Sequence, residues 1–281
     1  MTTLNCYATL AEFKSYSTNR GGDVSYDAAD DTVIERLLKA ASRYVDTKTG
    51  RRFTPYVETR YFDVPSADSL DVRTLNLDTD LLEIFSVTNG DGVVIASTEY
   101  SLRPRNSSPY RAIRLIDSST YYWASDSSGD THDVIAIAGL WGCHDQYSQA
   151  WPLATTAAEA LDTTETAYDV TDGTGFAVGD LSRFDNELGY ISAIATNTLT
   201  ITRGENLSTA ATHLTGINVY VWRVMDEVKN AVLEITNTAY KRRFGQSLTS
   251  TETISPAGIV LSPRDIPMMA LDFISTYRRY T

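Results

Sequence analysis

The spacing of apolar residues changes twice along this chain, and that change limits the folds it can adopt. Near both ends of the chain, apolar residues recur every three to four positions, as on one face of an α-helix. Between Val57 and Leu140 they alternate instead, as on one face of a β-strand. This order predicts a chain of mixed α and β structure in which strands are inserted between packed helices.

Two helices are expected in the first fifth of the chain. Thr9 is expected to cap a short helix over Leu10–Tyr16. Thr32 and Glu35 fit a capping box for a longer helix, 32–49, because each side chain can pair a backbone N–H group that the first turn leaves free. The apolar faces of these helices need a partner to cover them.

A third helix is expected over Arg223–Phe244, with acidic side chains in its first turn and a basic cluster in its last. This charge order suits the helix dipole, which is positive at the N-terminus and negative at the C-terminus. The helix is the natural packing partner of 32–49, since both carry an apolar stripe.

The segment between these helices is expected to form two β-rich parts. Residues 57–154 predict a small antiparallel β-domain with a hairpin turn at Asn89-Gly90-Asp91-Gly92 and a strand at Tyr100–Arg103. Residues 155–221 contain short expected strands separated by Gly and Asn turns, namely FAVGDLSRF, LGYISAI, NTLTITRG and GINVYVW. They carry nine acidic and two basic side chains, a net charge of −7, which predicts an inserted module with a solvated or cation-facing surface.

The last twenty residues, SPRDIPMMALDFISTYRRYT, are expected to form an amphipathic helix that opens at Pro263. A polar segment rich in Thr and Ser, 246–255, precedes it and is expected to act as a tether. A short apolar helix on a tether suits docking in the groove of a partner. The residues expected to dock are Ile266, Met269, Phe273, Ile274, Tyr277, Arg278 and Arg279.

Together these elements predict an α+β fold. It consists of an α-helical bundle of three to four helices, an antiparallel β-domain and an inserted small β-barrel-like domain. The expected domains are 1–56 with 222–245 as the helical core, 57–154 as the β-domain, 155–221 as the acidic insert, and 246–281 as the tether and C-terminal docking helix.

Basic residues end each of the longer expected helices, and two interpretations are open for them. As complements of the helix dipole, they stabilise helix C-termini. Gathered at one end of an acidic molecule, they would suit stacking against a dissimilar partner and would set the orientation of that contact. The residues expected to take that electrostatic role are Arg51, Arg52, Lys241, Arg242 and Arg243.

The overall composition bears on the partners of the chain. With 36 acidic and 24 basic side chains, its formal net charge is −12, which argues against binding nucleic acid through a basic face. No apolar stretch approaches the roughly 20 residues of a membrane span, so no membrane partner is expected. The two cysteines are far apart, imply no disulfide framework and fit synthesis in a reducing cytoplasm.

No pattern in the sequence favours an enzyme, a metal site or a cofactor site. Cys143, His144 and His132 lack the spaced pairs of structural zinc ligands. The loop Asp126–Asp133 carries oxygen ligands but lacks the order and the closing Glu of a calcium loop. Neither a nucleophile elbow nor a phosphate-binding glycine loop occurs. We therefore expect no catalytic, metal-binding or cofactor-binding residues.

The order of these elements resembles the head–tail connector, or adaptor, proteins of tailed bacteriophages. The segments that carry the resemblance are, in order, YATLAEFKSY, DTVIERLLKAASRYVDTKTGRRF, LLEIFSVTNGDG with YSLRPRN, VIAIAGLWG, VMDEVKNAVLEITNTAYKRRFG and SPRDIPMMALDFISTYRRY. They cover most of the chain outside 155–220. That insert departs from the simplest members, which pass almost directly from the Trp-Gly turn to the long helix.

The resemblance implies a structural protein of the virion neck that is assembled in the host cytoplasm. It implies a homo-oligomeric ring, a dodecamer, which binds the portal protein on one side and a tail, stopper or terminator protein on the other. Genomic double-stranded DNA would pass through the channel without sequence-specific binding. The resemblance also implies that the C-terminal arm docks into the portal or between neighbouring subunits.

Two other functions stay open from the sequence. The turn-rich strands of 155–221, which bear Tyr and Thr side chains, could instead bind a carbohydrate or a host surface, as a decoration or tail receptor-binding module. An enzyme such as a cell-wall hydrolase is disfavoured, because no catalytic constellation emerges from the residues. Deletion of 155–221 would separate the first alternative from the connector function.

Overall fold

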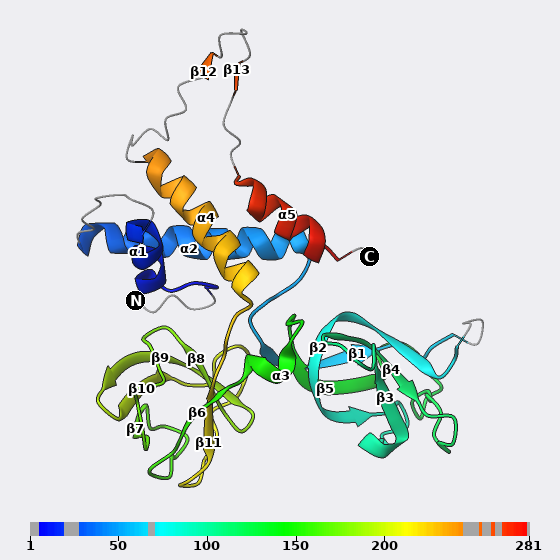
Figure 1. Cartoon of the computed structure of the whole chain (residues 1–281). Coiled ribbons are helices and arrows are strands. Elements are labelled where there is room, and N and C mark those ends of the chain that lie inside the picture. The colour runs from blue at the N-terminus through cyan, green and yellow to red at the C-terminus, as the bar shows by residue number, and fades with distance from the viewer. Residues whose placement is uncertain are drawn as a thin grey trace. The chain divides into compact units, whose positions relative to one another are not determined.

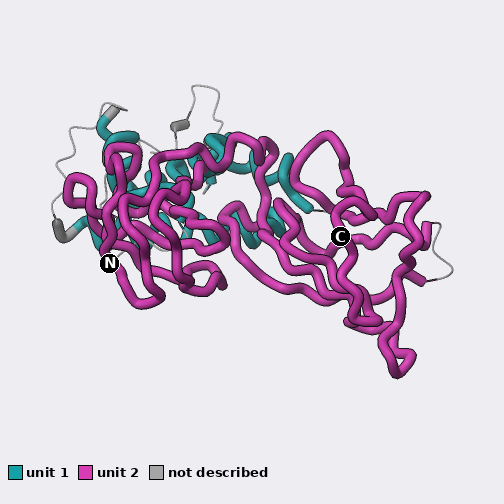
Figure 2. Tube along the Cα trace, turned by 90° about the horizontal axis from the view of Figure 1, so that it is seen from below, with its two compact units in different colours: residues 1–51, 224–281 teal, residues 52–223 magenta. Residues whose placement is uncertain are grey.

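The computed structural model describes residues 6–19, 28–66, 71–243, 253–254, 260–261 and 266–279. The chain divides into two compact units, which Figure 2 draws in different colours. Unit 1 comprises residues 1–51 and 224–281, and unit 2 comprises residues 52–223. Unit 1 contains the longer helices, and unit 2 is built around two antiparallel sheets.

In unit 1, helix α2 contacts each of the other described helices (Figure 1). Helix α4 in turn contacts α1, α2 and α5. The described elements are α1 (Leu10–Asn19), α2 (Ala28–Thr49), α4 (Asp226–Arg243), α5 (Met268–Tyr277) and a pair of short strands, β12 (Thr253–Ile254) and β13 (Val260–Leu261).

The start of α1 confirms its predicted cap, whereas the predicted start of α2 is wrong. Glu12 N–H donates to Thr9 Oγ1 at 3.2 Å, and Thr9 N–H donates to Glu12 Oε2 at 2.8 Å, as in a capping box. Helix α2 begins at Ala28, so Thr32 lies inside it. Two aspartates in its first turn complement the helix dipole and favour the earlier start. Gly50, with a φ of 66°, ends α2 as predicted.

Helix α5 begins at Met268, later than the predicted start at Pro263. Pro267 accounts for the difference, because a proline inside a helix lacks the N–H that the helix needs and disfavours helical geometry in the residue before it. Pro263 lies outside the described residues, as does the predicted tether apart from 253–254.

The first sheet of unit 2 has five strands in the order β1-β5-β2-β4-β3. Strand β2 is long, and register shifts let its first half pair with β4 and its second half with β5. Leu81, Ile113 and Trp141 lie in the core of this part. The strands are β1 (Tyr56–Phe62), β2 (Thr74–Thr88), β3 (Tyr100–Arg103), β4 (Tyr110–Leu115) and β5 (Ile135–Trp141), with the 3₁₀ helix η1 (Ser97–Glu99) before β3.

The second sheet of unit 2 has six strands in the order β6-β11-β8-β9-β10-β7. Its end strands meet through a bridge between Ala157 and Val170, so the sheet curls around a core that includes Tyr168 and Phe184. The strands are β6 (Leu153–Thr156), β7 (Ala167–Asp169), β8 (Leu181–Phe184), β9 (Glu187–Ala195), β10 (Thr198–Thr202) and β11 (Asn218–Val221), and the short helix α3 (Tyr147–Ala150) precedes them.

The predicted hairpin after β2 is only half present. Its turn exists, because Gly92 has a φ of 81° and its N–H donates to Asn89 O at 2.9 Å. The expected second strand is reduced to a single bridge between Thr88 and Val94, after which the chain enters η1. Strand β3, in contrast, has the predicted bounds, and β8 to β11 fall on the predicted strand segments of 155–221.

The predicted fold class is wrong. The chain is mostly antiparallel β, with two sheets and few, mostly short helices, and it is not a helical bundle of three to four helices with β-domains attached. The reason lies in the distribution of buried apolar area. Large fully buried side chains such as Trp141, Tyr168 and Phe184 belong to strands of unit 2, whereas among the described helices only α2 and α4 are longer than ten residues.

Candidate functional site

A groove of about 430 Å³ lies in unit 1 between α4 and α5. One stripe of each helix forms its walls, at the three- and four-residue spacing of a single helix face. Acidic side chains lie among its mostly apolar lining. The lining residues are Glu227, Asn230, Ala231 and Glu234 of α4, and Met269, Asp272, Phe273, Thr276 and Tyr277 of α5. We call this surface the α4–α5 groove.

The expected docking residues of α5 divide between the interior of unit 1 and its surface. Phe273 and Ile274 are buried, with 8 % and 9 % exposed. The Phe273 ring stacks on the Tyr277 ring, with 4.7 Å between their centroids. Met269 is 64 % exposed and lines the groove. Ile266, just before the helix, is half-buried. Helix α5 therefore covers part of its apolar face within its own unit and presents Met269 to solvent.

The C-terminal end of α5 is bonded to the end of α2. Arg51 Nε donates to Tyr277 O at 2.6 Å, and Arg279 N–H donates to Thr49 O at 2.7 Å. An arginine at this position satisfies a carbonyl that the helix leaves free and complements the negative end of its dipole. Arg278, beside these bonds, is exposed. The predicted role of Arg51 as a dipole complement thus applies to α5, with which it is paired in space.

The remaining basic residues of the prediction lie in different settings. Arg52 belongs to unit 2, where its guanidinium lies 4.5 Å from the centroid of the Tyr56 ring and Nη2 donates to Asn206 Oδ1 at 3.1 Å. This arginine therefore joins elements within unit 2. Lys241 is half-buried near the end of α4, and nothing is described of the side chains of Arg242 and Arg243.

A basic surface of unit 1 was missed by the sequence analysis. Arg36, Lys39, Ala40 and Arg43 are all exposed and follow one side of α2. We call these four residues the α2 stripe. The buried residues of α2 lie on its opposite side and include Ile34, Leu38, Ala41 and Val45. Charged residues on the exposed face of a helix are common, so this pattern in the sequence did not indicate a binding surface.

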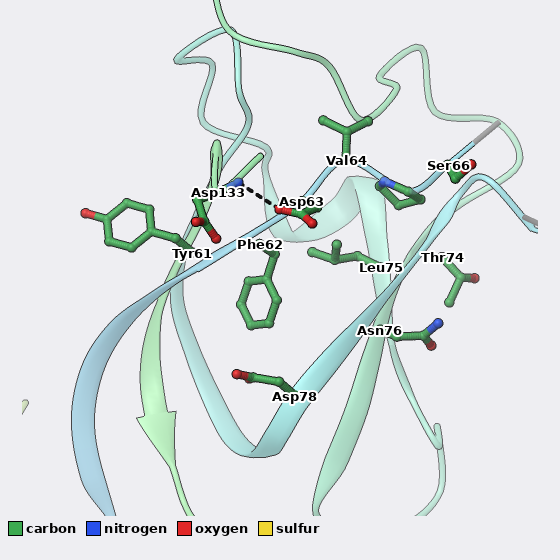
Figure 3. Close-up of a pocket in the computed structure, with 11 residues that line it drawn as sticks. Tyr61, Phe62, Asp63, Val64, Ser66, Thr74, Leu75, Asn76, Asp78 and Asp133 are labelled. Carbon is green, nitrogen blue, oxygen red and sulfur yellow. Dashed lines mark hydrogen bonds between the residues drawn. The ribbon is translucent and has the colours of Figure 1, made fainter. Parts of the chain in front are cut away.

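A wider pocket of about 600 Å³ lies in unit 2 between the end of β1 and the start of β2 (Figure 3). Asp63, Asp78 and Asp133 line it, and none of its described lining residues is basic. Two of these carboxylates are already engaged. Asp78 accepts hydrogen bonds from Arg60 at 3.1 and 2.5 Å, and Asp63 accepts the Asp133 N–H at 2.9 Å, the dashed line in Figure 3. These two carboxylates have hydrogen-bond partners within the protein, so the pocket gives no evidence for a bound ligand.

A polar contact joins the two sheets of unit 2. Arg183 Nη1 of β8 donates to Glu83 Oε2 of β2 at 2.8 Å, and the Tyr147 hydroxyl donates to the same oxygen at 2.7 Å. Burial by itself would raise the pKa of Glu83, but the bonds from Arg183 and Tyr147 outweigh it and hold that pKa below its usual range. The contact couples the 155–221 segment to the first sheet.

A second group of buried charges, also missed from the sequence, lies inside the 155–221 segment. Arg203 donates from Nε and Nη2 to the two oxygens of Glu187 at 2.8 and 2.7 Å, and His213 Nε2 lies 2.9 Å from Glu187 Oε2. The side chains of Arg203, Glu187 and His213 are 5 %, 1 % and 2 % exposed. Glu187 is therefore no part of the solvated acidic surface that composition predicted.

The pKa of Glu187 reflects a balance of two effects. Burial acts to raise it, since a charge is poorly solvated in the interior. Hydrogen bonds from Arg203, from the Ala211 N–H at 2.9 Å and from His213 act in the opposite direction and prevail, so the pKa lies below its usual range. The ionised carboxylate is the form that this network stabilises.

His144 and Asp126, two of the residues considered as metal ligands, are held by hydrogen bonds to the backbone. His144 Nδ1 accepts the Gln146 N–H at 3.1 Å, which leaves Nε2 to donate to Arg223 O at 3.1 Å. Asp126 accepts the Asp130 N–H at 2.8 Å within its own turn. Within the described ranges, no three His, Cys, Asp or Glu side chains are grouped as they would be around a metal ion.

No protein-family model matches this chain, and no curated protein or solved structure matches it either. None of the described helices has both the length and the apolar character that crossing a membrane requires. Inference about function therefore begins from the order of the elements and from the surfaces of unit 1.

Proposed function

We propose that this protein is a structural, non-enzymatic subunit of a bacteriophage head–tail connector. In this proposal, copies of the chain form a homo-oligomeric ring, a dodecamer, in the neck of the virion. The ring binds the portal protein on one side and a tail, stopper or terminator protein on the other, and genomic DNA passes through its channel. The order of sequence segments that resembles connector proteins supports this assignment.

The observation that carries the proposal is the α4–α5 groove. Met269, Phe273 and Tyr277, three of the residues expected to dock, line this one groove. Grooves with apolar walls and polar rims commonly receive a helix of a partner. Exposed apolar side chains at the edge, such as Met269, add contact area that a partner would cover. The groove thus supports a role for the C-terminal helix in assembly.

The charge of the chain supports the passage of DNA rather than its binding. A net charge of −12 disfavours close approach of the phosphate backbone, because binding DNA releases counterions only where basic side chains replace them. A channel built from such subunits would hold DNA loosely. Binding of double-stranded DNA to the isolated chain should accordingly be weak and independent of sequence.

The test uses the full chain, its Met269→Glu variant and a portal protein from a tailed phage that carries this gene. Electron micrographs should show rings, and biolayer interferometry should detect portal binding. Met269 is 64 % exposed, so a charge there tests assembly without disturbing the interior, unlike a change at buried Phe273. The variant should weaken ring assembly or portal binding about tenfold or more.

Val94→Glu is the matched control, because Val94 is 61 % exposed and lies in unit 2. It should assemble and bind as the wild type does. A wild-type chain that forms no rings and binds no portal would refute the connector function.

The alternative function, carbohydrate or host binding through 155–221, stays a prediction. The groove and the pocket described above are both lined by residues outside that segment. Glycan binding by the full chain that is lost when 155–221 is deleted would favour it, provided the deletion variant still folds. The Glu83–Arg183 contact makes that proviso necessary, because the deletion removes Arg183.

A further inference from the structure

We propose that the α4–α5 groove of one copy receives the α2 stripe of a neighbouring copy. This inference rests on the proposed connector function and names the contact that would build its ring. The occupant of the groove is then a second copy of this chain, rather than a segment of the portal. Charge and position on unit 1 each support this choice.

The two surfaces carry opposite charges. Glu227 and Asp272 are exposed groove residues, Glu234 beside them is buried, and no described lining residue is basic. The α2 stripe carries three basic side chains and no acidic one, and all of them are exposed. Complementary charge of this kind sets the orientation of partners and suppresses wrong contacts.

The α2 stripe offers both charge and room for close approach. Arg36 and Arg43 are exposed and lie about 10.5 Å apart along the helix axis, because seven residues of α-helix rise that far. Ala40 lies between the two arginines and is exposed. Its small side chain lets the α2 backbone approach the groove closely.

The apolar lining of the groove fits long basic side chains. Lysine and arginine can lay their methylene stems along an apolar surface while the charged ends reach its rim. The exposed Met269 side chain and Ala231, which both line the groove, offer such a surface. Burial of these stems would add hydrophobic stabilisation to the electrostatic attraction.

The two surfaces lie on different sides of unit 1. Helix α2 contacts α4 and α5, and Figure 1 shows α4 crossing it. The buried side of α2 carries Leu38 and Ala41, and the α2 stripe lies on the opposite side. One copy can therefore offer its groove to one neighbour and its stripe to the next. Such a head-to-tail contact generates a ring when the rotation closes.

Two charge-reversed forms of the full chain test the contact. The stripe variant carries Arg36→Glu with Arg43→Glu, and the groove variant carries Glu227→Arg with Asp272→Arg. All four residues are exposed, so each variant should keep the fold of unit 1. Circular dichroism and thermal unfolding check this before assembly is measured.

Mass photometry and sedimentation velocity then measure assembly with and without portal. Each variant alone should lose affinity for itself by about tenfold or more, because like charges then face each other. An equimolar mixture should recover assembly, since every groove then meets a stripe of opposite charge. Salt at about 0.5 M should weaken the wild-type contact relative to about 0.05 M. A control with Arg103→Glu and Arg105→Glu, two exposed arginines at the end of β3 and just after it, should assemble normally.

Four results would overturn the inference. The wild type could stay monomeric with and without portal, the variants could assemble as well as the wild type, or the mixture of two defective variants could fail to recover. Rings that persist while the groove variant loses portal binding would assign the groove to the portal and overturn it too. Portal binding keeps the two proposals apart, because a chain that binds portal without this contact refutes only the contact.

Discussion

Replacement of Glu187 with Ala should destabilise unit 2 strongly. The change leaves the Arg203 guanidinium, only 5 % exposed, without the carboxylate that it bonds through two nitrogens. It also removes the acceptor of the Ala211 N–H and the partner of His213 Nε2. Loss of one member of a buried ion pair typically costs about 3–5 kcal/mol, and the additional lost bonds place this case toward the upper end.

The exposed pair of Asp117 and Arg114 provides a comparison for the energetic cost of losing a carboxylate. Asp117 accepts a hydrogen bond from Arg114 Nη2 at 2.9 Å, but its side chain is 81 % exposed. Water and salt screen such a pair, so Asp117→Ala should cost no more than about 1 kcal/mol. The two variants remove the same kind of group, and only burial and the number of bonds differ.

Urea unfolding, followed by tryptophan fluorescence, measures both free energies. Trp151 and Trp222 report on this region, because their rings lie 4.9 Å apart at the two ends of the 155–221 segment. A double variant, Glu187→Leu with Arg203→Met, should recover much of the loss, since apolar residues of similar size replace a buried pair without leaving a charge. If Glu187→Ala costs no more than Asp117→Ala, the buried pair has no such role and the reasoning fails.

Glu83→Gln should reduce the acid sensitivity of unit 2. The pKa of Glu83 is lowered on folding, so its contribution to the free energy of unfolding is complete above the unfolded pKa of about 4.3 and is lost as pH falls through the folded pKa. Urea unfolding at about pH 6 and about pH 3.5 should therefore show a smaller loss of that free energy on acidification in the variant than in the wild type. Gly139→Ala should lower the free energy of unfolding by about 1–3 kcal/mol, because its Cβ would lie 2.5 Å from Glu83 O. Gly216→Asn has open space around it but a φ of 85°, so backbone strain alone should cost about 1 kcal/mol. Burial raises the pKa of the Cys6 thiol to about 11, so its alkylation at pH 8 should be at least about tenfold slower in the native chain than in urea, and equal rates would contradict that burial.

The elements that sequence reasoning located correctly depend on neighbours in the chain. Thr9 and Glu12 pair within one turn of α1, and Gly50 ends α2 through its own backbone angle. Strand β3 has the predicted bounds for a similar reason, since alternation over a few residues is enough to indicate a strand. Pro267 also indicates the late start of α5 from the sequence alone, because a proline disfavours a helix that continues through it.

The sequence by itself thus determined the order of helices and strands, the net charge and the apolar face of the C-terminal helix. Only the tertiary structure decided which part of that face is covered, because α5 contacts α2 and α4 from distant parts of the chain, and Phe273 is buried while Met269 is exposed. The tertiary structure also decided the burial of Glu187 and Arg203. Composition predicts them as surface charges, but the curled sheet brings them together in its interior. Burial and pairing depend on contacts between distant segments, and local spacing does not encode them.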